Sequence, residues 1–150
     1  MGCWGMKSRK FSFTPSEKRH YRRLLITALR NHQEILFAYL FGSFSEDLPF
    51  SDLDVGIYLS PGALPPEKAR QYEIEMGIAL DLKVGLPVDL IVLNYAPLAL
   101  RYHIASGQLL FSRDEPARFA FLEATWRDYF DYYPMVRQFS RDLFEPLPRS

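Results

Sequence analysis

Two carboxylates that open an apolar strand constrain this chain more than any other feature of its sequence. Asp52 and Asp54 flank Leu53 at the start of a run of strand-forming residues that extends to Leu59. Side chains two positions apart on a strand project from the same face, about 7 Å apart at the backbone. Two like charges that converge beside an apolar sheet repel each other and resist desolvation unless a cation lies between them. The pair therefore predicts a site for a hard cation, and Mg²⁺ suits carboxylate and phosphate oxygens.

The surrounding pattern predicts strands that alternate with helices. Strands are expected at 35–41, 52–59, 87–94 and 108–111. Helices are expected from an N-cap at Ser16 to about Asn31, at 67–83, at 97–106, and from about 115 with a break at Pro134. Such an alternation favours an α/β (α+β) fold in which helices flank a small mixed β-sheet. If the strands at 52–59 and 87–94 are neighbours, Asp89 stands beside Asp52 and Asp54.

A Gly-Ser pair, Gly42-Ser43, lies between the first strand and the two carboxylates. Glycine lets the backbone approach a phosphate, and the serine can donate its hydroxyl and its N–H. Taken singly, each feature has an ordinary origin: a turn, a chance pair of acids, a solvent-facing Asp89. Their combination predicts two Mg²⁺ ions, roughly 3.5–4 Å apart, at a site for nucleotidyl transfer. Asp52 and Asp54 are then the metal ligands, and Asp89 is either the third ligand or the base for the acceptor proton.

Length and composition limit the class of protein. A chain of 150 residues with 48% hydrophobic residues predicts one globular domain, assigned to residues 11–150 after a mobile leader at 1–10. One cysteine excludes a disulfide framework and suggests a reducing compartment, so a cytoplasmic location is expected. No apolar run is long enough to span a membrane.

Charge is distributed unevenly although the net charge is zero. Residues 1–31 hold eight basic residues and one acid, whereas residues 32–150 hold ten basic residues and seventeen acids. The basic segment is interpreted either as a solvated helix face or as a docking surface for RNA or an acidic protein.

With these residues in view, the sequence resembles the minimal nucleotidyltransferases of the DNA polymerase β-like superfamily. Gly42, Ser43, Asp52, Asp54 and Asp89 match that family's motif. Over roughly residues 16–133, segments such as 40–44, 88–94 and 107–111 are similar to the MNT antitoxins of bacterial HEPN–MNT toxin–antitoxin pairs. The resemblance implies an enzyme that uses ATP and Mg²⁺ to transfer AMP to a tyrosine of a HEPN ribonuclease toxin and so neutralises it. It also implies a hetero-oligomer with that toxin, and it does not imply a nucleic-acid substrate.

The sequence departs from the family in the loop after the Gly-Ser pair. Eight residues separate Ser43 from Asp52, two fewer than usual, and Ser45-Glu46-Asp47 stands where the family commonly has Ala-Arg-Gly. Acidic side chains thus replace a basic side chain that could help to hold a triphosphate. Lys83 or Arg101 is a candidate to supply the missing positive charge.

Two alternative functions follow from this loop and from the superfamily. One is an antitoxin of weak activity that neutralises its toxin by direct binding; the other is an aminoglycoside-type transferase that acts on a small molecule.

Two further features are given structural interpretations. His103 is expected to be a packed or surface histidine, and the aromatic segment 126–133 to belong to the core or to a partner surface.

Overall fold

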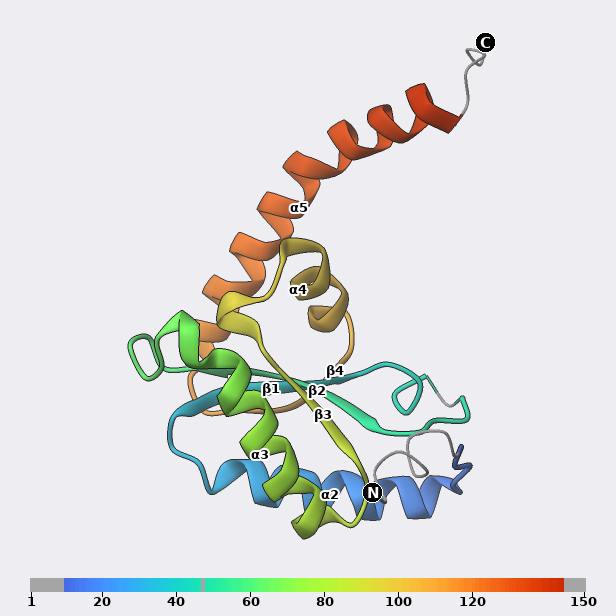
Figure 1. Ribbon diagram of the computed structural model, residues 1–150, viewed down its shortest axis with the longest axis vertical. Coiled ribbons are helices and arrows are strands. Elements are labelled where there is room, and N and C mark those ends of the chain that lie inside the picture. Colours follow the sequence, from blue (N-terminus) through green and yellow to red (C-terminus); the bar gives the residue numbers. More distant parts are fainter. Residues whose placement is uncertain (1–9, 47, 145–150) are drawn as a thin grey trace.

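The described part of the chain is built on one β-sheet with helices on both faces (Figure 1). This is seen in a computed structural model that describes residues 10–46 and 48–144. All of the expected leader except Lys10 lies outside the described residues, as does Asp47 of the short loop.

The observed elements follow the order expected from the sequence. They are α2 (Pro15–Arg30), β1 (Ile35–Phe41), β2 (Leu53–Leu59), the 3-10 turn η1 (Pro66–Lys68), α3 (Ala69–Val84), β3 (Val88–Val92), the 3-10 turn η2 (Leu93–Tyr95), α4 (Leu98–Ala105), β4 (Gln108–Ser112) and α5 (Glu115–Phe144).

The sheet is mixed, with strand order β3-β2-β1-β4. β1 pairs antiparallel with both β2 and β4, while β2 and β3 pair in parallel and are connected through α3. A parallel pair needs such a crossover, because a tight turn can only reverse the chain. The predicted α+β fold with a small mixed sheet is therefore confirmed. In particular, the strands that carry Asp54 and Asp89 are neighbours.

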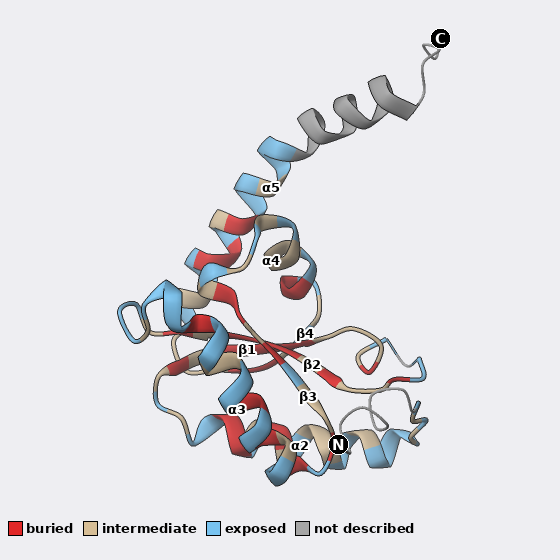
Figure 2. Ribbon diagram, in the orientation of Figure 1, coloured by how far each residue is buried: buried red, intermediate tan, exposed pale blue. Residues whose placement is uncertain are grey.

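Two apolar clusters cover the two faces of the sheet (Figure 2). On one face α2 and α3 pack with residues such as Leu25, Leu80 and Val55. On the other face α4 and α5 pack on an aromatic layer in which Phe37 stacks on Tyr58, with ring centroids 4.8 Å apart. Because side chains alternate along a strand, Asp52 and Asp54 share the face of Tyr58 and point to the α4–α5 side.

Helix α2 begins two residues earlier than expected. Its N-cap is Thr14 and not Ser16: the Thr14 hydroxyl accepts from the N–H of Glu17, and the Glu17 carboxylate accepts from the N–H of Thr14. This reciprocal capping box, with Pro15 at the first helical position, satisfies donors that Ser16 cannot reach.

Two other boundaries also differ from expectation. β3 stops at Val92, because Asn94 continues the pairing with its side chain, which bonds both the N–H and the carbonyl of Leu59. Helix α5 runs past Pro134 to Phe144, so the expected break is wrong. A proline removes one backbone hydrogen bond, and that loss alone does not end a long helix.

The outer edge of the sheet at β3 is covered by carboxylates from α3. Asp81 accepts from the N–H of Val88 at 2.6 Å, and Glu73 accepts from the N–H of Val92 at 2.8 Å. These N–H groups face away from β2 and would otherwise be unpaired.

Candidate metal and nucleotide site

Three carboxylates converge where β2 and β3 begin. Asp54 and Asp89 are direct partners in the parallel register, and Asp52 lies just before β2. Each of the three offers an oxygen within 4.8 Å of the others. Asp52 and Asp54 are half-buried and Asp89 is exposed. Such a set of hard oxygen donors, open to solvent on one side, fits Mg²⁺.

Position 42 requires a glycine because it lies close to this triad. Gly42 follows Phe41, the last residue of β1, which pairs with Asp54. The φ angle of Gly42 is +81°. A Cβ at position 42 would collide with the Oδ2 atom of Asp54. The glycine therefore lets bare backbone pack directly against a triad carboxylate, which no residue with a side chain could do.

The short loop after Gly42 is held in place by aromatic packing. Phe44 and Phe50 are buried and meet edge to face, with ring centroids 4.8 Å apart. Lys18 of α2 lies over the Phe44 ring and donates to the Phe44 carbonyl at 2.7 Å. Phe11 exchanges two backbone hydrogen bonds with Phe50. The loop is thus anchored at both ends even though it is shorter than usual.

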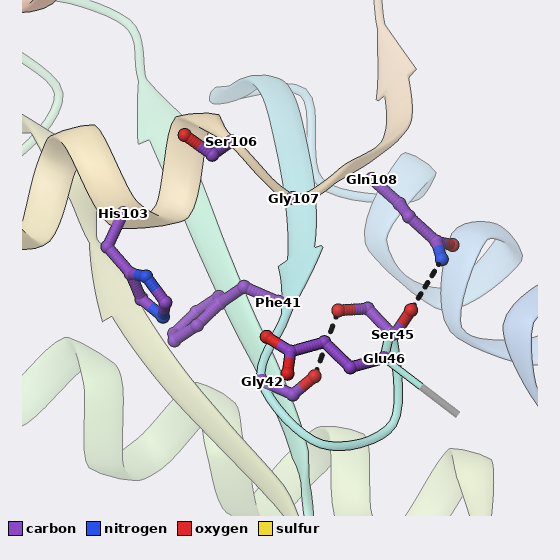
Figure 3. Close-up of a pocket in the computed structure, with 8 residues that line it drawn as sticks. All are labelled: Phe41, Gly42, Ser45, Glu46, His103, Ser106, Gly107 and Gln108. Carbon is purple, nitrogen blue, oxygen red and sulfur yellow. Dashed lines mark hydrogen bonds between the residues drawn. The ribbon is translucent and has the colours of Figure 1, made fainter. Parts of the chain in front are cut away.

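A pocket of about 370 Å³ opens beside Gly42 (Figure 3). Its wall comes from the end of β1, the loop and the end of α4, where the imidazole of His103 meets the Phe41 ring edge to face at 5.9 Å. The loop supplies the Glu46 carboxylate, which lies near Gly42 in the close-up. Gln108 closes the far side and donates to the carbonyl of Ser45 at 3.0 Å.

The structure brings most of the predicted residues together. Asp52, Asp54, Asp89 and Gly42 lie at one end of the sheet. Ser43 lies in the turn that follows, where its carbonyl accepts from the N–H groups of Glu46 and Leu48, and it does not line the pocket. The roles of these residues as ligands remain predictions.

The two substitute cations proposed from the sequence lie elsewhere. Lys83 lines a groove along α2 together with His20 and Arg23, and Arg101 lines a pocket beside Asp114 and α5. Neither residue lines the pocket at Gly42. The hypothesis that either could replace the missing loop base is therefore not supported.

His103 is a surface histidine, as expected, and it also lies on the wall of this pocket, which the sequence does not indicate directly. The available clue was Gly107, since only a glycine allows the chain after α4 to pass against the Leu40 carbonyl. That close contact brings the last turn of α4 to the end of β1.

The family profile described as Polymerase beta, Nucleotidyltransferase matches residues 24–116. The match covers more than half of the chain and contains the triad and the Gly-Ser pair. The chain belongs to this family. Among curated proteins, by contrast, no sequence matches the chain.

Three solved structures with the same fold are of toxin–antitoxin complexes. One chain belongs to a complex of tri-AMPylated HEPN toxin from Shewanella oneidensis with MNT antitoxin; it is 20% identical, with a TM-score of 0.65, and the match covers 84% of this chain and 98% of that one. A chain of the toxin–antitoxin MntA-HepT is 19% identical, with a TM-score of 0.64 and coverage of 83% and 97%. A chain from a toxin–antitoxin structure with AMP-PNP is 21% identical, with a TM-score of 0.63 and coverage of 81% and 97%. At these identities the likeness establishes the fold.

In the described ranges, no helix combines the length and the apolar character needed to cross a bilayer.

Proposed function

We propose that this chain is an Mg²⁺-dependent nucleotidyltransferase antitoxin of the cytoplasm, which transfers AMP from ATP to a tyrosine of a cognate HEPN toxin and thereby neutralises it. The observation that carries the proposal is that Asp52, Asp54 and Asp89 each offer an oxygen within 4.8 Å of the others. Beside them lies Gly42, a position where any side chain would collide with Asp54. Family membership and the toxin–antitoxin origin of the structural neighbours support the same assignment.

The reaction assigns a task to each residue. The tyrosine oxygen attacks the α-phosphorus of ATP, the α–β phosphoanhydride bond breaks, and pyrophosphate leaves with the electron pair of that bond. Asp52 and Asp54 would hold the two Mg²⁺ ions. When bound, the ions neutralise the phosphate charge that increases in the transition state. Asp89, the third carboxylate of the set, would be the base that accepts the tyrosine proton. Gly42 and the N–H of Ser43 approach the phosphates.

Transfer of label from ATP to the partner tests the proposal. The purified chain is incubated with the product of the neighbouring reading frame and ATP labelled on the α-phosphate. The expected result is label on a tyrosine of the partner. Excess EDTA is expected to reduce labelling to background, and Mg²⁺ to restore it. Label on RNA or on an aminoglycoside, and none on the partner, would contradict the assignment of the acceptor.

One observation favours a second candidate, an antitoxin that acts by binding alone. The Glu46 carboxylate lines the pocket where the phosphates of ATP would lie (Figure 3). A fixed negative charge at that place opposes a triphosphate and weakens ATP binding. In this candidate the chain neutralises its toxin without turnover, so a variant that lacks Asp52 and Asp54 carboxylates still protects at full strength.

Replacing Glu46 tests whether its carboxylate opposes ATP, which is the premise of the second candidate. If ATP binds in this pocket, Glu46→Gln is expected to lower the KM for ATP about five- to tenfold, because it removes ~1 kcal/mol of repulsion. Initial rates over a range of ATP concentrations measure the effect, and Glu67→Gln, an exposed acid in η1, is the control. An unchanged KM would place the triphosphate away from Glu46.

A further inference from the structure

Three large aromatic side chains stand exposed along one side of α5. Phe119, Trp126 and Phe130 are 58%, 43% and 58% exposed. Their spacings of seven and four residues place them on one face of a helix. We call this face the aromatic stripe. In Figure 1, α5 leaves the sheet and runs past α4, so the stripe lies on the part of the helix that is next to α4.

The aromatic stripe is connected to the pocket beside Gly42 through α4. Tyr102 of α4 stacks on Tyr129 of α5, with ring centroids 3.8 Å apart, and meets Phe130 edge to face at 6.1 Å. One turn further along α4, Ser106 donates to the Tyr102 carbonyl at 3.0 Å and lines the pocket. A partner seated on the stripe therefore also lies next to the candidate nucleotide site.

The charges on the same segment of α5 indicate what kind of partner surface would complement the aromatic stripe. Over residues 115–132 there are four acids and two arginines. Arg118 is bound to Glu115 at 2.7 Å and Arg127 lies 3.6 Å from Asp128, so both cations have acidic neighbours on the same helix. Of the remaining acids, Glu123 lies on the face of the stripe, four residues after Phe119, and Asp131 lies further around the helix; neither pairs with a described cation. An exposed aromatic face on a segment with more acids than bases complements an apolar socket that is bordered by lysine or arginine.

We propose that the aromatic stripe is the docking surface for the protein whose side chain receives AMP, and that this protein presents a basic, apolar-lined groove to it. The identity of the partner rests on the proposed function. Docking on the stripe holds the partner beside α4, and so sets its acceptor side chain at the pocket next to the triad. Aromatic side chains that become buried when a complex forms carry a large share of the affinity of protein complexes.

Affinity for the purified product of the neighbouring reading frame tests the stripe. In calorimetric titrations, Trp126→Ala with Phe130→Ala is expected to bind at least about 100-fold more weakly than the wild type. The matched control removes the exposed aliphatic row of α3, with Ile78→Ala and Leu82→Ala, and is expected to bind within about threefold of the wild type. Circular dichroism and unchanged ATP binding verify that both variants are folded.

A charge-reversed variant tests the predicted character of the partner's groove. Glu123→Lys with Asp131→Lys is expected to slow association, and more so at low salt, because the variant removes electrostatic attraction. Faster association of this variant would contradict the prediction that the partner's groove is basic.

The remaining outcomes distinguish the docking surface from the reaction. The variant Asp52→Asn with Asp54→Asn is expected to bind the partner at full affinity without transferring AMP. A wild-type chain that binds through the stripe but transfers no AMP leaves the docking surface in place and removes the proposed reaction. Full affinity of the Trp126/Phe130 variant, or a wild-type chain that does not bind the partner, overturns the docking surface. So does self-association of the wild type that this variant abolishes, since a second copy would then cover the stripe.

Discussion

Replacing both half-buried carboxylates, Asp52→Asn with Asp54→Asn, is expected to lower AMP transfer by at least about 10³-fold, or roughly 4 kcal/mol of activation free energy. Asparagine keeps the size and shape of each side chain but removes the two charges that would hold Mg²⁺. The fold should not suffer, because relieving repulsion between like charges leaves thermal stability unchanged or higher. Rates with labelled ATP, together with a melting curve, measure the two effects separately.

The control for this variant removes two negative charges elsewhere. Glu67→Gln with Glu75→Gln changes exposed acids near the start of α3, and transfer should remain within about twofold of the wild type. A titration with Mg²⁺ alone adds a readout that needs neither ATP nor a partner: heat of binding should be lost in the Asp52/Asp54 variant and kept in the control. Transfer that survives the double substitution would place the reaction at another site.

The second large effect is expected for Gly42→Ala. The added methyl group meets the Asp54 carboxylate, so it displaces a proposed metal ligand as well as straining a backbone with φ of +81°. Transfer is expected to fall at least about 100-fold, as misplacement near 1 Å can do. Strain at a positive φ should lower stability by about 1–2 kcal/mol.

Gly62 provides a matched control for the backbone strain. Its φ is +82°, and nothing lies within 4 Å of the position that a Cβ would occupy. Gly62→Ala therefore carries the same strain without the collision, so urea unfolding should show a similar loss of stability while transfer stays near the wild-type rate. If the two variants lose transfer equally, the contact between Gly42 and Asp54 has no part in the reaction.

The sequence was sufficient for the Asp52/Asp54 pair and for the suspicion attached to Asp89, because both arguments are local. Alternation on a strand places Asp52 and Asp54 on one face, and a charged Asp89 inside an otherwise apolar strand is costly unless a cation or solvent compensates it. The order of the four strands and the register that sets Asp54 opposite Asp89 needed the structure. That register depends on how α3, which connects the two strands, packs on the face of the sheet, and hydrophobic spacing does not specify this.

Other parts of the site depend on contacts between distant segments. His103 reaches the pocket because α4 ends against β1, some sixty residues earlier in the chain. The loop anchor depends on Phe11 pairing with Phe50, which no spacing rule connects. The N-cap at Thr14 was in principle readable, since threonine followed three residues later by Glu17 is a capping box.

The carboxylates that cover β3 also restrict how this protein can assemble. An open strand edge accepts a strand from almost any chain, and it is a common route to fibres and to indiscriminate pairing. Here Asp81 and Glu73 already occupy two of the N–H groups that such a strand would need. A partner strand on that side of the sheet would find two of the backbone donors already taken. Association there therefore depends more on the side chains of the partner than on its backbone.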